Sequence, residues 1–385
     1  MSAANDMLAP AGAGRLPPPG PMPAIDTMQA TAAIVAGRLA PLTVRVDREG
    51  LYPAEVMREL GAAGAFRHHL DVPGLGPGAG LGAAVEAMAI VSRECLSTGF
   101  MVWCQDTCAW YLEHSENVGL RAVMLPRLGT GAALGGTGLS NAVKHFSGIE
   151  KLQLQAAPVA GGYVVNGVLP WVSNLGPDHC FGTVFHVDGS SPREVMALVD
   201  CASDGFTLRR TPEFTALEGT GTFACQFDDV FIPEERLIAD PVGPWLKRVR
   251  PGFILLQAGM AIGAIRGCID VMRGVEPMLG HVNAYLEDRP DELEGELAEL
   301  AAGLEPLLAD PLDTSDERYR EVLELRLMAS ELTLRAAHSA MLHAGARGYQ
   351  AEAAAQRKLR EAYFVAIVTP AIKHLRKELA GLAAD

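Results

Sequence analysis

The spacing of apolar residues changes twice along this chain, and that change constrains the fold more than any other feature. Apolar residues recur at helical spacing from about 29 to 128, alternate with period two between about 129 and 240, and return to helical spacing from about 244 onward. Helices repeat every 3.6 residues and strands every two. A chain of 385 residues also exceeds one ordinary hydrophobic core. We therefore expect an α+β multidomain protein with a helical N-terminal domain at 29–128, a central β-domain at 129–243 and a C-terminal helical bundle at 244–385.

Within these parts, local patterns predict individual elements. Helices are expected at 52–64, 81–96, 100–113, 253–272, 315–344 and 353–380, and strands at 153–156, 163–167, 180–187, 194–200, 206–210 and 222–227. Gly161 and Gly162 predict a tight turn between the first two strands, because glycine readily adopts a positive φ. Residues 1–28 are rich in proline and glycine and are expected to form a leader outside the domains.

Composition excludes several classes of partner and site. A net charge of −14 repels a phosphate backbone, so we expect no nucleic-acid binding. The seven cysteines form no CxxC pair and no histidine completes a metal site, which favours structural thiols in a reducing compartment and no bound metal. We see no apolar run of transmembrane length and no signal peptide, and therefore expect no membrane span and a cytoplasmic location.

One predicted strand ends in an unusual group of side chains. The stretch YVVNGVLPWVSN at 163–174 finishes on Trp171, Ser173 and Asn174. An indole is a flat, polarizable wall, and short polar groups beside it suit the binding of a flat heteroaromatic ring. The alternative is an interior tryptophan followed by a turn serine.

Five segments in the same order resemble the acyl-CoA dehydrogenase family. GGYVVNGVLPWVSN resembles its β-domain strand ending in Trp-x-Ser/Thr-Asn, and CQFDDVFIPEERLI at 225–238 resembles its Phe-Asp-Asp-Val-x-Val-Pro segment. MRELGAAGAF at 57–66 resembles the family's Leu-Gly-x-x-Gly helix end. GARGYQ at 345–350 and QRKLREAYF at 356–364 resemble its Gly-Gly-x-Gly-Tyr and Arg-Asp-Ala segments. The resemblance implies the family fold, FAD bound between the β-domain and the bundle, and a homo-oligomer, usually a homotetramer.

The resemblance also implies roles for particular side chains. Trp171 would pack against the flavin ring, Ser173 would hydrogen-bond near flavin N5, and Thr137 would meet the pyrimidine edge of the flavin. Hydrogen-bond donors at these positions favour the reduced, negatively charged flavin. Ser140 and Asn141 fall in a loop at 139–148 that normally borders the acyl-thioester site, and this loop is longer and more basic here than in the family.

Residues that hold the rest of FAD in the family are replaced in this chain. The family's Arg-x-x-Phe, which reaches a neighbouring subunit's FAD, reads Met-Leu-Gly-His at 278–281. The glutamine before Gly-Gly-x-Gly is replaced near Leu342. Arg347 and Lys144 are the candidates to compensate.

The largest departure concerns the catalytic base. Dehydrogenation removes a proton α to the thioester carbonyl while hydride leaves the β-carbon for N5, and a positioned carboxylate must take the proton. The family's glutamate lies nine residues after the Arg of Arg-Asp-Ala, and the same count from Arg360 ends at Thr369. The position that carries the base in other family members falls near Gly252. A Glu-Gly-Thr at 218–220 spells the catalytic motif, but it lies in the β-domain, where the family has a structural loop.

Other titratable residues could replace the base. His374 lies one turn beyond Thr369, on a basic helix end that favours a cation there, and is a weak candidate. Asp106 and His114 are two helical turns apart and could share a face, and His145 lies in the 139–148 segment. Glu361 replaces the family's structural aspartate, so we expect a cap or an ion pair there.

These observations support three hypotheses about function. The first is an FAD-dependent oxidoreductase that oxidises an acyl thioester, on CoA or a carrier protein, or a related small molecule at its Cα–Cβ bond, with the electron acceptor left open. The second is a monooxygenase of the same fold, which uses reduced flavin and oxygen and needs no catalytic glutamate. The third is a catalytically silent binding or assembly subunit, since a fold alone does not define a function.

Overall fold

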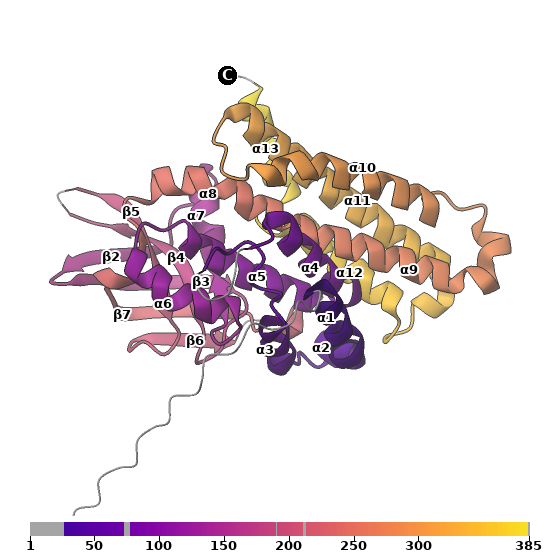
Figure 1. The fold of residues 1–385 in the computed structure, drawn as a ribbon, viewed down its shortest axis with the longest axis horizontal. Coiled ribbons are helices and arrows are strands. Elements are labelled where there is room, and N and C mark those ends of the chain that lie inside the picture. Colours follow the sequence, from indigo (N-terminus) through magenta and orange to yellow (C-terminus); the bar gives the residue numbers. More distant parts are fainter. Residues whose placement is uncertain (1–26, 73–77, 190, 211–212, 384–385) are drawn as a thin grey trace, which may run out of the picture.

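The computed structural model describes residues 27–72, 78–189, 191–210 and 213–383 (Figure 1). Helices come first, a sheet follows, and a second group of helices completes the chain, which confirms the predicted fold class. The predicted leader at 1–28 lies outside the described residues except for its last two, which begin the first helix.

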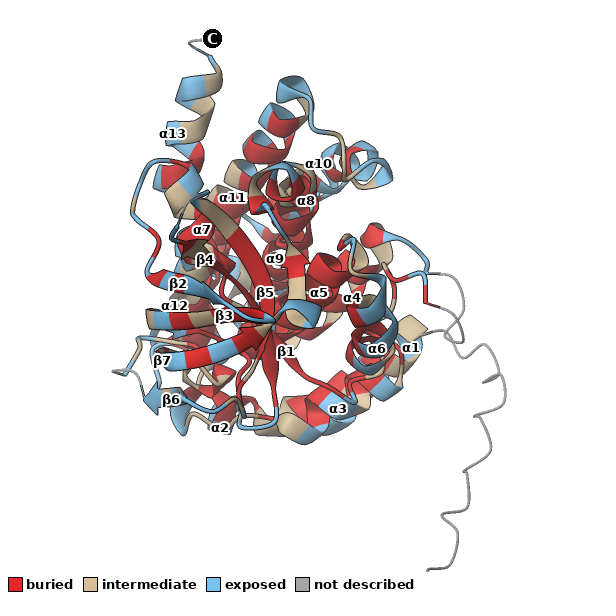
Figure 2. Ribbon diagram, turned by 90° about the vertical axis from the view of Figure 1, so that its left-hand side faces the viewer, coloured by how far each residue is buried: buried red, intermediate tan, exposed pale blue. Residues whose placement is uncertain are grey.

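The N-terminal helices surround one buried helix, α5. Nearly every residue of α5 is buried, as the red ribbon in Figure 2 shows, and it contacts α4, α6, α8, α9 and the sheet. It begins at Leu96 rather than at the expected residue 100. The elements of this part are α1 (Thr27–Ile34), η1 (Val35–Leu39), η2 (Ala40–Leu42), α2 (Thr43–Arg48), α3 (Ala54–Ala62), α4 (Leu81–Glu94), α5 (Leu96–Glu113) and α6 (Val118–Gly129).

The central sheet has strand order β6-β7-β3-β2-β4-β5-β8, and β1 pairs parallel with β4. All six predicted strands are present, and Gly161 makes the β2–β3 turn with a φ of 80°. β1 and β8 were not predicted, because three residues are too few to show an alternating pattern. The strands are β1 (Gly135–Thr137), β2 (Leu154–Val159), β3 (Gly162–Val172), β4 (Cys180–Val187), β5 (Arg193–Asp200), β6 (Phe206–Arg210), β7 (Phe223–Pro233) and β8 (Leu237–Ala239).

The segment expected to be a loop at 139–148 is mostly helix α7 (Leu139–Phe146), so that prediction is wrong. Leu139, Ala142 and Val143 are buried on one face of α7, at the spacing that places side chains together on a helix. Burial of this apolar face explains why the insertion is ordered as a helix.

The C-terminal helices form a bundle that extends away from the sheet (Figure 1). The helix expected at 353–380 is interrupted, because Pro370 has no N–H for a helical hydrogen bond and disfavours helical backbone at Thr369. The helix expected at 253–272 is part of two longer helices that meet at Gln257. The bundle comprises α8 (Val242–Leu256), α9 (Ala258–Asn283), α10 (Pro290–Ala309), α11 (Asp316–Gly348), α12 (Ala354–Ile367) and α13 (Ile372–Leu382).

The α8–α9 segment also corrects the expectation about membrane-length runs. Among the described residues, Val242–Asn283 is long and apolar enough to cross a membrane by length and composition. Of its most apolar window, 94% is buried inside the structure, as in the core helix of a bundle.

Candidate functional site

Four of the predicted site residues form two contacting pairs, which the short segment from Thr137 to Ser140 connects at the start of α7. Thr137 and Ser173 form an isolated antiparallel bridge between the ends of β1 and β3. Residues directly opposite in such a pair carry their side chains on the same face. Ser140, in the first turn of α7, has its Oγ 2.7 Å from Oγ1 of Thr369. We call these four residues the hydroxyl corner.

Three further hydroxyl groups support this corner, and none was predicted from the sequence. Ser173 Oγ lies 2.6 Å from Thr222 Oγ1, which lies 2.7 Å from Thr220 Oγ1. Thr137 Oγ1 lies 2.5 Å from the phenol of Tyr111, whose pKa burial raises. The sequence signal that could have revealed Thr220 and Thr222 is their i, i+2 spacing at the start of β7.

Thr220 belongs to the Glu-Gly-Thr at 218–220 that spells the catalytic motif. The Glu218 carboxylate accepts a hydrogen bond from the backbone N–H of Phe214 within the same loop. The Thr220 hydroxyl donates to the carbonyl of Leu217 at 2.7 Å. Both contacts agree with a structural loop at this point.

Trp171 lies on the exposed side of the corner. The pairing of β3 with β7 shifts between Leu169 and Val172, so Trp171 falls at an irregularity of the ladder. Its side chain is 60% exposed, and its ring meets Phe214 edge to face at 6.4 Å. The alternative of an interior tryptophan is therefore excluded, and the indole, two residues before Ser173 in the chain, is largely open.

The turn that carries Thr369 is held from inside the bundle. Its carbonyl accepts a hydrogen bond from Gln257 Nε2 at 2.8 Å, and Gln257 Oε1 accepts one from Arg326 Nε at 2.6 Å. Arg326 is fully buried and also donates to the carbonyl of Val365, so its partners are neutral and burial lowers its pKa to about 10. This network positions Thr369, yet its hydroxyl is far too weak a base to remove an α-proton unaided.

The other family position for the base, Gly252, has no room for a carboxylate. A Cβ built on Gly252 would lie 2.2 Å from Cζ2 of Trp110. The indole donates its N–H to the carbonyl of Val249 at 3.0 Å, which keeps the ring in place. Neither family position therefore offers a carboxylate.

His374 fastens α13 to α7. Its Nε2 lies 2.8 Å from Ser147 Oγ and 3.6 Å from a carboxylate oxygen of Glu378. Lys377 donates to the carbonyl of the same Ser147 at 2.7 Å. The hydrogen bond with His374, together with Arg250, lowers the pKa of Glu378 to about 2.

Asp106 and His114 do not form a pair. Asp106 Oδ1 lies 3.9 Å from Nε2 of His69, and burial raises the pKa of Asp106 well above its usual range. The ring of His114 packs instead against Trp110, with centroids 4.0 Å apart, and burial lowers its pKa to about 4. Asp106 precedes Tyr111 by five residues, about 140° around α5, so it points away from the corner.

Two remaining candidates lie near groups of opposite charge. Glu361 is buried, which raises its pKa, while the charges of Arg357 and Lys358 oppose that rise. His145 Nε2 lies 4.0 Å from a carboxylate oxygen of Glu194 on β5. These surroundings agree with the structural role expected for Glu361.

Asn141 belongs to the joint between α7 and β2. Its amide donates to Glu150 Oε1 at 2.8 Å and to the carbonyl of Lys151 at 2.9 Å, and its Oδ1 accepts from the N–H of Gln153. Lys144 lies 3.6 Å from the same Glu150. The amide of Asn141 therefore has structural partners.

Arg347 lies near the end of α11, at the end of the bundle remote from the sheet (Figure 1). Its Nη1 lies 2.9 Å from Sδ of Met278, where the family's arginine is missing. Met278 and Leu342 are about half exposed. The replaced FAD-binding positions thus gather around Arg347, away from the hydroxyl corner.

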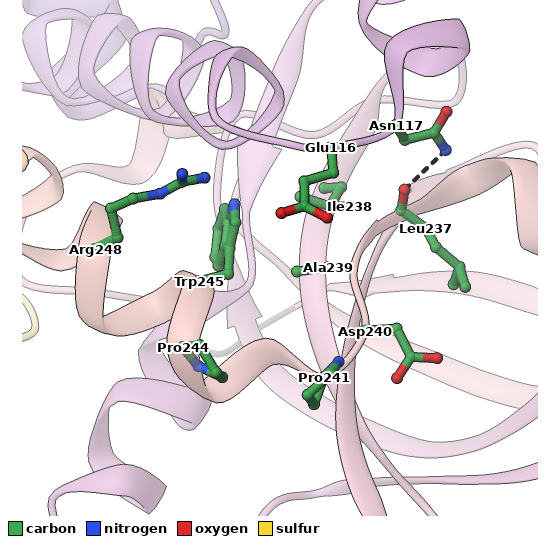
Figure 3. A pocket seen from close by; sticks show the side chains of 10 residues that line it. All are labelled: Glu116, Asn117, Leu237, Ile238, Ala239, Asp240, Pro241, Pro244, Trp245 and Arg248. Atoms are coloured by element: carbon green, nitrogen blue, oxygen red, sulfur yellow. Dashed lines mark hydrogen bonds between the residues drawn. The ribbon is translucent and has the colours of Figure 1, made fainter.

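A separate cavity of about 450 Å³ opens where β8 passes into α8. In Figure 3 the ring of Trp245 stands between Arg248 and Glu116, with Asn117 and Asp240 on the opposite wall. Trp245 and Arg248 both donate to the carbonyl of His114. None of the predicted flavin or substrate residues lines this cavity.

Comparisons with known proteins agree with this arrangement. The family model for the acyl-CoA dehydrogenase N-terminal domain matches residues 26–132. Benzylmalonyl-CoA dehydrogenase of Aromatoleum aromaticum is 24% identical over 344 residues, which cover 86% of this chain and 89% of that protein. The structure of butyryl-CoA dehydrogenase from Megasphaera elsdenii superposes with a TM-score of 0.81 at 17% identity, covering 94% of this chain and 97% of that one. A glutaryl-CoA dehydrogenase from Mycobacterium smegmatis, in complex with FADH2, superposes with a TM-score of 0.74 at 17% identity, covering 94% of each chain.

The helical domain, eight-stranded sheet and helical bundle are those of the acyl-CoA dehydrogenase fold. The match of its N-terminal residues and the relatives aligned over most of its length support membership of the acyl-CoA dehydrogenase family, at 24% and 22% identity to two of the curated relatives.

Proposed function

We propose that the protein is an FAD-dependent oxidoreductase that acts on an acyl thioester, carried by CoA or by a carrier protein. The observation that carries the proposal is the exposed indole of Trp171 two residues before Ser173, which pairs with Thr137 in the hydroxyl corner. The similarity to acyl-CoA dehydrogenases supports the same class of chemistry.

The residues of the corner fit a flavin ring. Trp171 offers a flat apolar surface, while Thr137 and Ser173 offer hydrogen-bonding groups on one face of the β-bridge. When bound, the flavin supplies the acceptor for a hydride. We assign Arg347, at the bundle end, to the FAD phosphates of a neighbouring copy in a homo-oligomer, because Arg347 lies beside the position where the family's intersubunit arginine is missing.

The substrate thioester would lie over α7 and the Thr369 turn. Ser140 and Thr369 share one hydrogen bond, so one of the two hydroxyl groups keeps its proton for a carbonyl oxygen. Gln257 keeps the turn in position. Removal of the α-proton needs a base other than these hydroxyl groups. Because the residues at both family base positions lack a carboxylate, a second function has specific support: a monooxygenase that uses reduced flavin and oxygen.

An absorbance spectrum of the purified protein, before and after addition of FAD, tests flavin binding. Anaerobic titration with acyl-CoAs of increasing length then tests the half-reaction, and bleaching of the flavin is the result expected for a dehydrogenase. Oxygen uptake that depends on added reduced flavin, without anaerobic bleaching, would instead establish the monooxygenase. A protein that takes up no flavin in either state would leave the silent-subunit hypothesis.

A designed variant tests the interpretation of the base position. Thr369→Glu combined with Ser140→Gly introduces a carboxylate at the family position and removes the hydroxyl that lies 2.7 Å away. If the thioester lies where we propose, this variant bleaches bound flavin faster than Ser140→Gly alone. Equal rates in the two variants would place the thioester elsewhere.

We also propose a cytoplasmic location. All seven cysteines are buried free thiols, which agrees with a reducing compartment.

A further inference from the structure

The chain of hydroxyl groups behind Ser173 has a single direction. Thr220 donates its only proton to the carbonyl of Leu217 at 2.7 Å, so it must accept from Thr222. Thr222 then has no proton left for Ser173, and Ser173 must donate to Thr222. Since a hydroxyl has one proton and two lone pairs, Ser173 presents only lone pairs to a ligand in the corner. The expectation of a hydrogen-bond donor at this position is therefore wrong, and Ser173 is an acceptor.

Thr137, directly opposite Ser173, has the reverse polarity. Tyr111 is fully buried, and within the described chain its phenol lies 2.5 Å from Thr137 Oγ1. The phenol must donate to Thr137, because a buried O–H without an acceptor is costly. Thr137 Oγ1 also accepts from the backbone N–H of Leu139 at 3.4 Å, so its own proton is available to a ligand.

We propose that this pair, an acceptor at Ser173 and a donor at Thr137, makes the site selective for reduced flavin. Reduced flavin carries a proton on N5, whereas N5 of oxidised flavin is an acceptor and would face the lone pairs of Ser173. Thr137 can donate to the carbonyl oxygen next to N5 in both states. The inference rests on the proposed flavin site, and it makes Thr220 a positioning residue that acts through Thr222 on Ser173.

A different placement of the ring gives a different outcome. The same pair could hold the N3–H of the flavin and an adjacent carbonyl, groups that both redox states share. In that case the hydroxyl chain would have no effect on the redox state. The redox potential of the bound flavin therefore separates the two placements.

The test substitutes Thr220 with valine, which keeps the branched shape and removes the anchor of the chain. The proton of Thr222 then becomes available to Ser173, and Ser173 can donate to the ligand. We expect the preference for reduced over oxidised flavin to fall about tenfold, which for a two-electron couple lowers the midpoint potential by about 30 mV. Spectroelectrochemistry gives the potential, and binding titrations with oxidised and reduced FAD give the affinity ratio independently of turnover.

Two variants serve as controls. Thr220→Ser keeps the donor and should retain the wild-type potential. Thr333→Val removes another buried threonine hydroxyl that donates to a backbone carbonyl at 2.7 Å, but within α11, and should leave the potential unchanged.

The outcomes are distinct. A lower potential in Thr220→Val with rescue in Thr220→Ser supports the inference. If wild type and Thr220→Val each bind oxidised and reduced flavin equally well, the inference is overturned and the proposed function stays intact. Wild-type protein that binds neither form of flavin overturns the proposed function together with the inference. If Thr220→Val does not fold, Thr222→Val breaks the same chain one link later and has the same expected result.

Discussion

Removal of the indole of Trp171 should weaken flavin binding by an amount that the structure allows us to estimate. The side chain is 60% exposed, which for an aromatic side chain of this size is about 150 Å² of surface. A ring stacked on one face would cover roughly half of it, and about 75 Å² at about 25 cal/mol per Å² contributes about 2 kcal/mol. We therefore expect Trp171→Ala to raise the dissociation constant of FAD about 20- to 30-fold.

Flavin fluorescence titration measures this constant. Phe231→Ala is the matched control, because Phe231 is an exposed aromatic residue, 49% accessible, that pairs with Val164 on a more distant part of the same sheet. The control should bind FAD like the wild type. A dissociation constant of Trp171→Ala within twofold of the wild-type value would refute the placement of the ring against this indole.

Three further predictions concern stability. Gly252→Ala pushes a methyl group into the indole of Trp110 and should destabilise the fold by about 1–3 kcal/mol. Gly274→Ala has open space around its Cβ and should stabilise the fold by up to about 1 kcal/mol. Urea unfolding that changes the free energy of unfolding in the same direction for both variants would contradict this packing. The pKa of Glu378 is about 2 in the folded protein and about 4.3 in the unfolded chain. The stabilising effect of its carboxylate is therefore complete above about pH 5 and is lost as the pH falls toward 2. The difference in unfolding free energy between wild type and Glu378→Gln should shrink over this range, and a constant difference would argue against the lowered pKa. Arg357→Met should cost about 1–3 kcal/mol because it removes one of the cations that offset the burial of Glu361, while Lys358 remains. Thermal melts should show partial recovery when Glu361→Gln is added, and no recovery would exclude the coupling.

The order of the three parts could be predicted from the sequence because periodicity is a local property. Most strands were predicted for the same reason. Trp171, Ser173 and Thr137 could be named as candidates because the resemblance rests on short continuous segments. The resemblance, with its motif spacing counted from Arg360, also implied that a carboxylate is missing at Thr369.

Other predictions failed where distant packing decides the outcome. The 139–148 segment looked like a loop, but an apolar face buried against the rest of the protein makes it α7. The α8–α9 segment has the length of a membrane span, yet neighbouring helices bury it. Asp106 lies in α5 and His114 caps its end, but Asp106 faces His69 while His114 faces Trp110.

The direction of the hydroxyl chain was decided by tertiary structure alone. Thr220 and Thr222 are ordinary residues of a loop and a strand start until the fold brings Ser173, 49 residues from Thr222 in sequence, within 2.6 Å of it. Likewise Tyr111 orients Thr137 only because α5 packs against β1. The sequence by itself determined which chemical groups are available and the order of the elements that carry them. Which group donates a proton and which accepts one depends on contacts between elements far apart in the chain, because one proton on each hydroxyl must be assigned across the whole network.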